Sequence, residues 1–252
     1  MPWRPAMNES VSYESTGDVA TITIRRANKL NALNEDVVRG LQEAWVRFES
    51  SNDRVAVLTS EGDRAFCVGA DLGAPPEAPW RAFPNVGARV TKPVIAAVFG
   101  HCAGGGYMLQ QYCDLTVAAD NTSFSYPEAK VGITGGLCAT VVSRIPHKIA
   151  MEFLLMGESI TAQRAYDVGM INRVVSPGSE LRVATEMART LASYAPLVTS
   201  LIKKFADAVI PLSPAEQQAH AQREITRVLQ SRDAKEGRQA FEEQRPANFQ
   251  GS

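Results

Sequence analysis

The sequence predicts an α/β fold whose C-terminal part is helical. Short apolar, β-branched runs alternate with amphipathic segments up to about residue 135, and from residue 146 onward the pattern is almost entirely helical. At 252 residues the chain is long enough for one large domain with a helical extension. We therefore expect an α/β core in residues 1–195 and a helical region in residues 196–252. Amphipathic helices with nothing internal left to cover favour oligomerisation.

The first elements follow the order strand, loop, helix. Residues 19–24 alternate apolar and polar side chains, which predicts a strand, and residues 25–33 form a polar loop. Asn34 is a suitable helix N-cap, with Glu35 in the first turn. The helix itself is predicted from apolar residues at helical spacing, namely Val37, Val38, Leu41, Trp45 and Phe48.

The next segment combines a buried strand with a run of small residues. Residues 55–58 are apolar, and residues 60–63 form the turn that ends the strand. Residues 66–72 include small side chains where the backbone would have to approach a ligand closely. Residues 73–85 contain four prolines, which predicts an irregular loop or a short broken helix that walls a pocket.

A glycine-rich turn near the middle of the chain is the most informative stretch. Residues 93–99 have the pattern of a buried strand, three glycines follow at 104–106, and a helix can begin at about Gly105. Glycine lets another group approach the backbone without a Cβ in the way, and the free N–H groups of the helix would face that group. The turn therefore predicts an anion or oxyanion site, although a tight strand-to-helix connection has the same pattern.

Beyond this turn the predicted elements become mainly helical. Residues 115–119 are a further strand candidate, and Glu128 is a lone acid just after Pro127 in a mostly apolar stretch. Residues 134–136 open the next helix. The later predictions are helices at 147–156, 161–169, 180–194 and 213–244, with a strand-like pair at 174–175.

Composition and charge exclude several classes of function. The net charge of −1 and the pI near 6.3 give no electrostatic case for nucleic acid or an anionic membrane. No run approaches the roughly 18 apolar residues of a membrane span, so no membrane partner is expected. The cysteines lack paired metal-ligand spacing, which predicts no metal site and reduced thiols in a cytoplasmic protein. They are Cys67, Cys102, Cys113 and Cys138.

Short motifs occur along nearly the whole chain, at residues 31–33, 65–72, 92–97, 104–106, 113–114, 127–128, 132, 160–165 and 169–174. In their order and their residues, these motifs resemble those of the enoyl-CoA hydratase/isomerase family, also called the crotonase family. The resemblance implies a superhelix of ββα units with C-terminal helices that build trimers, commonly paired into hexamers. It also implies an acyl-CoA thioester as substrate, with coenzyme A as part of that substrate and no separate cofactor.

The same resemblance implies the roles of particular residues. The thioester oxygen would lie in an oxyanion hole made by the backbone N–H groups of Val68 and Gly105, which stabilise the charge that develops on an enolate oxygen. Arg25 and Lys29 would contact the CoA, although a solvated loop explains them equally well. The complete set of implied substrate contacts is Arg25, Lys29, Ala32, Ala70, Asp71, Leu72, Met108, Gly136 and Arg245.

One departure from the family pattern bears on the reaction. Family members that hydrate a double bond resemble one another in carrying two glutamates, of which this chain has the second, Glu128, but has Met108 at the first position. A single carboxylate is enough to move a proton between two carbons of one enolate, so Glu128 as the single acid/base favours double-bond isomerisation over hydration. An apolar pocket would raise its pKa toward neutrality. Met108 would pack against an acyl chain or the core.

Several hypotheses stay open for these residues. Glu128 could act alone in an isomerase, it could support hydration of a 2-enoyl-CoA without the first glutamate, or the chain could be a catalytically weak acyl-CoA binding protein. Glu128 could also be a capping or salt-bridged acid. His101, beside the glycine turn, is more often a structural residue than a base, and Tyr107 points about 100° away from Met108 on a helix.

Overall fold

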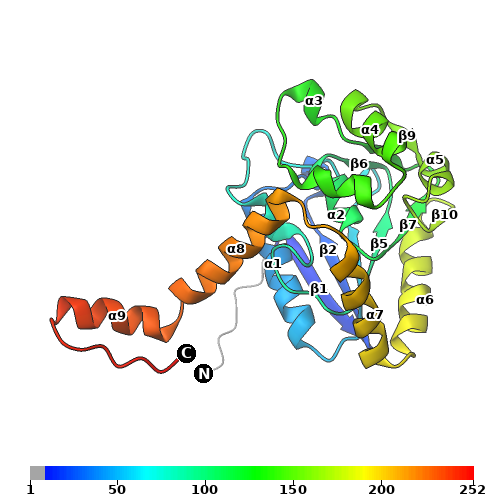
Figure 1. Ribbon diagram of the computed structural model, residues 1–252. Coiled ribbons are helices and arrows are strands. Elements are labelled where there is room, and N and C mark those ends of the chain that lie inside the picture. Colours follow the sequence, from blue (N-terminus) through cyan, green and yellow to red (C-terminus); the bar gives the residue numbers. More distant parts are fainter. Residues whose placement is uncertain (1–8) are drawn as a thin grey trace.

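The computed structural model describes residues 9–252, which form two sheets and a set of surrounding helices (Figure 1). The larger sheet has six strands in the order β1-β2-β3-β5-β7-β10. Strands β1 and β2 are antiparallel, and the remaining neighbours are parallel. The strands are β1 (Val11–Thr16), β2 (Val19–Ile24), β3 (Val55–Ser60), β5 (Val94–Val98), β7 (Leu115–Ala119) and β10 (Arg173–Val175).

A second sheet of four short strands carries the segments next to the predicted site. Its order is β4-β6-β8-β9, and the first three strands are parallel. They are β4 (Ala65–Cys67), β6 (His101–Ala103), β8 (Ser123–Ser125) and β9 (Ile160–Thr161). Because β3–β4, β5–β6 and β7–β8 are consecutive pairs that each place one strand in each sheet, the chain winds through repeated β-β units. Parallel neighbours of this kind need crossover connections.

Helices cover both faces of the larger sheet. Helix α1 (Glu35–Ser50) buries Trp45 and Phe48 on the side that also holds α2 (Gly105–Gln111). The N-cap prediction is confirmed, since the Asn34 side chain accepts a hydrogen bond from the Val37 amide at 3.1 Å. Helix α6 (Glu180–Ala192) packs its alanines on the opposite face. The other helices before residue 195 are α3 (Glu128–Val131), α4 (His147–Met156) and α5 (Ala162–Asp167).

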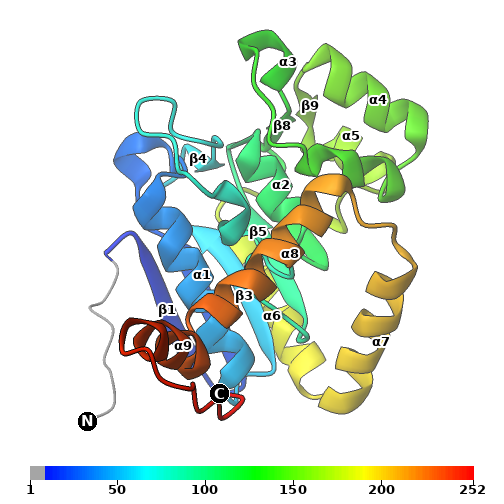
Figure 2. The same ribbon diagram turned by 60° about the vertical axis from the view of Figure 1, so that its left-hand side comes forward.

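Three helices follow residue 195. Helix α7 (Pro196–Val209) has no buried residue, and its large apolar side chains are between 47% and 85% exposed. Helix α8 (Pro214–Leu229) starts against the core, where Ala219 is buried. Helix α9 (Arg232–Glu242) stands apart from both sheets, as Figure 1 shows, and the turned view of Figure 2 shows α8 leading to it. No helix in residues 9–252 is long and apolar enough to cross a bilayer.

The structure differs from the sequence-based elements in a few places. The segment predicted as one helix at 213–244 breaks between α8 and α9, because Ser231 caps α9 by accepting a hydrogen bond from the Ala234 amide. The helix expected after Gly136 is a 3-10 helix, Leu137–Ser143. Residues 79–82 form a short 3-10 helix, which confirms the broken helix predicted in that loop. Strand β6 lies inside the turn predicted between the central strand and helix.

Candidate active site

The glycine-rich turn joins β6 to the N-terminus of α2. Gly104 is the N-cap residue, with φ 53° and ψ −122°, a backbone conformation that residues other than glycine rarely adopt. A Cβ on Gly106 would lie 2.1 Å from the Cys67 carbonyl oxygen, so only glycine lets α2 pack this closely on β4. The amide of Gly105 belongs to the first turn of the helix, where N–H groups have no intrahelical acceptor. This amide is therefore available to an anion.

A second backbone segment, at residues 69–71, lies against this helix end. A Cβ on Gly69 would be 3.0 Å from the Gly105 nitrogen, and Gly69 has φ 93°. Leu33 pairs with the segment: its N–H donates to the Gly69 oxygen at 2.8 Å, and its oxygen accepts the Asp71 N–H at 2.9 Å. Because both bonds flank Ala70, the Ala70 N–H points away from the Leu33 backbone.

The amide of Ala70 lies close to the same helix end. Its nitrogen is 3.8 Å from the point where a Cβ on Gly105 would lie. Val68, the donor implied by the family resemblance, comes two residues earlier, directly after β4 and before the Gly69 bend. The geometry therefore favours Ala70 over Val68 as the second donor beside Gly105.

Glu128, the first residue of α3, lies over the same turn. Its Oε1 is 2.7 Å from the point where a Cβ on Gly104 would lie. Its Oε2 is buried and has no hydrogen-bond partner among the described residues. Burial raises the pKa of this carboxyl to about 7. A carboxyl that titrates near neutrality and has a free oxygen can accept and return a proton.

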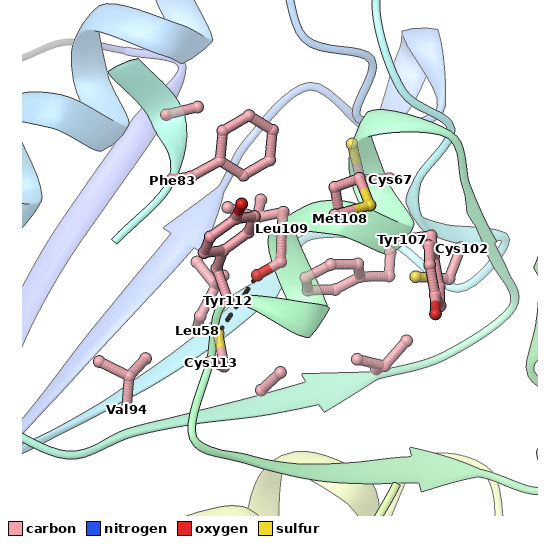
Figure 3. Packing of buried hydrophobic residues seen from close by; sticks show 14 of the residues in the cluster. Leu58, Cys67, Phe83, Val94, Cys102, Tyr107, Met108, Leu109, Tyr112 and Cys113 are labelled. Atoms are coloured by element: carbon pink, nitrogen blue, oxygen red, sulfur yellow. Dashed lines mark hydrogen bonds between the residues drawn. The ribbon is translucent and has the colours of Figure 1, made fainter. Parts of the chain in front are cut away.

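Met108 and Tyr107 are core residues in this structure. Met108 is 3% exposed and belongs to the same buried cluster as Cys67, part of which Figure 3 shows. The Tyr107 ring packs against Phe153 at 4.7 Å and edge-on to Tyr126 at 6.5 Å, measured between ring centroids. The Tyr107 hydroxyl is buried without a partner in the described chain, and burial raises its pKa well above the ordinary value. A phenol that holds its proton so firmly does not replace the missing glutamate as a base.

Six of the predicted substrate contacts come from two neighbouring segments. The pairing of Leu33 with Ala70 places the loop at 25–32 beside residues 70–72. On the loop, Arg25 and Lys29 are exposed and Ala32 is buried. Arg25 lies 3.8 Å from Glu61, measured between Nε and Oε2, with half of each side chain exposed. Leu72 is 69% exposed.

Asp71 has protein partners for both carboxylate oxygens. Its Oδ2 is 2.7 Å from Nη2 of Arg26, and its Oδ1 accepts the Gly73 N–H at 3.0 Å. The hydrogen bond from Arg26 holds the pKa of Asp71 below its usual value. Arg26 is a residue that the sequence reasoning missed, because nothing in the pattern of residues 25–33 distinguishes it from the exposed Arg25.

Other predicted residues lie farther from the turn. Gly136 adjoins the start of α8, since a Cβ on it would be 3.2 Å from the Ala215 Cβ. Arg245 follows α9, where it pairs with Glu236 and Glu243. The structure of this single chain does not bring Arg245 to the turn. His101 is exposed on β6, and residues 9–252 contain no cluster of acids, histidines and cysteines able to hold a metal ion.

Comparisons with known proteins identify the family of this chain. The enoyl-CoA hydratase/isomerase family matches residues 14–252. An (E)-benzylidenesuccinyl-CoA hydratase of Thauera aromatica is 34% identical over 96% of this chain and 99% of its own length. A carnitinyl-CoA dehydratase of Proteus mirabilis is 35% identical over 97% of this chain and 100% of its own.

Solved structures share the fold as well. A crystal structure of carnitinyl-CoA hydratase from Mycobacterium avium superposes with a TM-score of 0.76 at 34% identity, covering 97% of this chain and 99% of the other. A probable enoyl-CoA hydratase/isomerase from Mycobacterium abscessus gives 0.73 at 36% identity, covering 97% of this chain and 99% of the other. The fold is thus that of the crotonase family. The chain belongs to the enoyl-CoA hydratase/isomerase family and is an acyl-CoA-processing enzyme.

Proposed function

We propose that this enzyme shifts the double bond of an enoyl-CoA thioester, with Glu128 as its single acid/base. The observation that carries the proposal is the environment of Glu128: a buried, unpartnered Oε2, a pKa of about 7, and a position over the Gly104 turn. The position at which the family resemblance implies the other glutamate of hydrating members is Met108, which is 3% exposed. This site therefore offers one carboxylate for proton transfer.

The proposed reaction needs no second acid. With the thioester oxygen held by the amides of Gly105 and Ala70, the Glu128 carboxylate removes a proton from C2 of a 3-enoyl-CoA. The electron pair moves onto the thioester oxygen, and the dienolate is stabilised by the two amides. Protonated Glu128 then returns the proton to C4, so the double bond lies between C2 and C3 and the carboxylate is regenerated. The residue acts in both directions because its pKa is near the working pH.

Hydration of a 2-enoyl-CoA is the second candidate, and the names of the relatives favour it. The Thauera aromatica relative is a hydratase and the Proteus mirabilis relative a dehydratase. Hydration requires that one group activates water while another delivers a proton to carbon. With Met108 in place of one of these groups, Glu128 would have to perform both steps, which makes slow hydration the expected side reaction.

A pair of substrates separates the candidates. Purified enzyme is incubated with a 3-enoyl-CoA and, separately, with crotonyl-CoA, and each rate is compared with that of Glu128→Gln. Isomerisation that is fast in the wild type and lost in the variant supports the proposal. Rapid, Glu128-dependent loss of crotonyl-CoA absorbance would instead establish hydration. If neither substrate turns over but acyl-CoA raises the melting temperature equally in both proteins, the chain is an acyl-CoA binding protein.

We also propose that the subunits assemble through α7, as a trimer or a dimer of trimers. Its exposed apolar residues recur on one face of the helix, and monomeric proteins rarely expose so large a continuous patch. These residues are Val198, Leu201, Ile202, Phe205 and Val209. The family resemblance implies that Arg245 lies near the CoA phosphates, and this contact stays a prediction for the assembled enzyme. Light scattering of the purified protein tests the assembly: the mass of a single chain would refute it.

A further inference from the structure

We propose that Arg26 is a positioning residue for the oxyanion hole, and that its ion pair with Asp71 aims the Ala70 amide at the thioester oxygen. The inference rests on the proposed function in one respect: it assumes that a thioester carbonyl binds between Ala70 and Gly105. It does not depend on which reaction follows. Arg26 itself touches no reacting atom in this account.

The loop that carries Arg26 is held rigidly at its far end by Asn31. This side chain is 1% exposed and uses its full amide: Nδ2 donates to the oxygens of Glu61 at 2.9 Å and Ala65 at 2.8 Å, and Oδ1 accepts the Arg26 N–H at 3.0 Å. The Asn31 N–H also donates to the Arg26 oxygen at 3.0 Å. The backbone of Arg26 is therefore fixed to the turn beside β4.

The Arg26 side chain connects this fixed loop to residues 69–71, which include the Ala70 amide. Its Nη1 donates to the Ala32 oxygen at 3.2 Å, and its Nη2 lies 2.7 Å from Oδ2 of Asp71. The two side chains are only 18% and 19% exposed, so solvent and salt screen the pair much less than a surface pair. The guanidinium thus spans from its own loop to the residue that follows Ala70.

On its C-terminal side Asp71 makes two local bonds: its Oδ1 accepts the Gly73 N–H at 3.0 Å, and its main-chain oxygen accepts the Ala74 N–H at 3.1 Å. These bonds tie Asp71 to its own turn, whereas the Arg26 pair ties it to another loop. The two main-chain bonds of Leu33 act as a hinge for residues 69–71, and the residues beyond Asp71 are exposed, beginning with Leu72 at 69%. Without the ion pair, the segment could rotate about the Leu33 bonds and turn the Ala70 N–H away from the carbonyl. Donors of this kind act only when they are aimed at the position of the developing charge.

The experiment measures carbonyl polarisation and turnover in the same variants. A conjugated aryl-enoyl-CoA absorbs at longer wavelength when its thioester carbonyl is polarised, so its absorbance on binding reports the oxyanion hole without requiring a reaction. Arg26→Gln and Asp71→Asn remove the ion pair with little change in size, and Arg26→Lys keeps the charge but loses the second hydrogen bond. Arg182→Gln breaks an exposed pair of the same 2.7 Å length on α6 and serves as the matched control.

We expect Arg26→Gln and Asp71→Asn each to reduce the red shift of the bound chromophore and to lower kcat by roughly 10- to 10²-fold with little change in KM, as expected for misplacement of one donor. Arg26→Lys should recover part of both. The double variant Arg26→Gln/Asp71→Asn should be no worse than either single variant, because the two residues act as one unit. Arg182→Gln should match the wild type.

Three results would overturn the inference. A full red shift and normal kcat in Arg26→Gln, with only a lower melting temperature, would make the pair merely structural. A raised KM with unchanged kcat would make Arg26 a direct CoA contact. A wild-type enzyme that binds the chromophore without any red shift would have no oxyanion hole, which would overturn the proposed function as well. If Arg26→Gln does not fold, Arg26→Lys and Asp71→Asn provide the same comparison.

Discussion

Replacing Gly104 by alanine should damage catalysis more than stability. The new Cβ would lie 2.7 Å from Oε1 of Glu128, whereas ordinary contacts begin at 3.4 Å, so the carboxylate must move by about 0.7 Å. A misplacement of about 1 Å can cost 10²-fold in rate, and we therefore expect kcat to fall roughly 10- to 10²-fold. Because the carboxylate is the movable end of a side chain, the clash itself adds little to the free energy of unfolding.

The cost of placing alanine at a positive φ is a separate effect on stability, and a control variant can measure it. Gly104 has φ 53°, and an alanine there costs about 1–3 kcal/mol, which corresponds to a melting temperature lower by roughly 2–12 °C for a chain of this size. Gly17→Ala is the matched control, since Gly17 has φ 66° but open space around its Cβ position. The assay is isomerisation of a 3-enoyl-CoA well below both melting temperatures. A Gly104→Ala enzyme within twofold of Gly17→Ala would refute the placement of Glu128.

Three further predictions address the same site. Burial raises the pKa of Glu128 to about 7, so wild-type kcat/KM should fall as pH drops below about 7 and the base becomes protonated. The stability linked to this proton should be lost as pH rises through about 7. Glu128→Gln should therefore melt higher than the wild type at pH 8, with a smaller difference at pH 5. An α-hydroxy acid at position 70 replaces the amide of Ala70 by an ester and so removes its N–H donor, which should lower kcat by about 10²–10³-fold. The same change at Val68 should have little effect. The opposite result would favour Val68 as the donor. Met108→Glu should cost about 1–3 kcal/mol because the site is apolar, yet raise crotonyl-CoA hydration relative to isomerisation, and Met108→Gln should not.

Local signals explain why much of the fold could be predicted from the sequence. The cap at Asn34 and the helical spacing of Val37, Leu41 and Trp45 depend only on neighbouring residues, so α1 is confirmed to within a residue of its predicted start. Short strands such as β6 gain stability from their partners rather than their own sequence, and three residues carry no periodic pattern. Helix α7 is not among the predicted elements, although it lies in the predicted helical region.

In the candidate site too, some features depend on local sequence and others on long-range packing. The glycine turn and Glu128 could be found from the sequence because their residue types and spacing are distinctive. The direction of a backbone N–H is different: the choice between Val68 and Ala70 depends on which amides Leu33 leaves free, and Leu33 is more than thirty residues away in the chain. The partner of Asp71 likewise depends on long-range packing, so Arg26 could not be distinguished from Arg25 before the loop was seen in three dimensions.

In the proposed mechanism, two backbone amides and Glu128 together form and quench a thioester enolate. Exchange of the C2 hydrogens of butyryl-CoA with D2O, followed by mass spectrometry, tests it most directly, because a saturated thioester can neither isomerise nor hydrate. We expect the wild-type enzyme to accelerate this exchange and Glu128→Gln to abolish it. Binding of butyryl-CoA without exchange by the wild type, or exchange that persists in the variant, would contradict it.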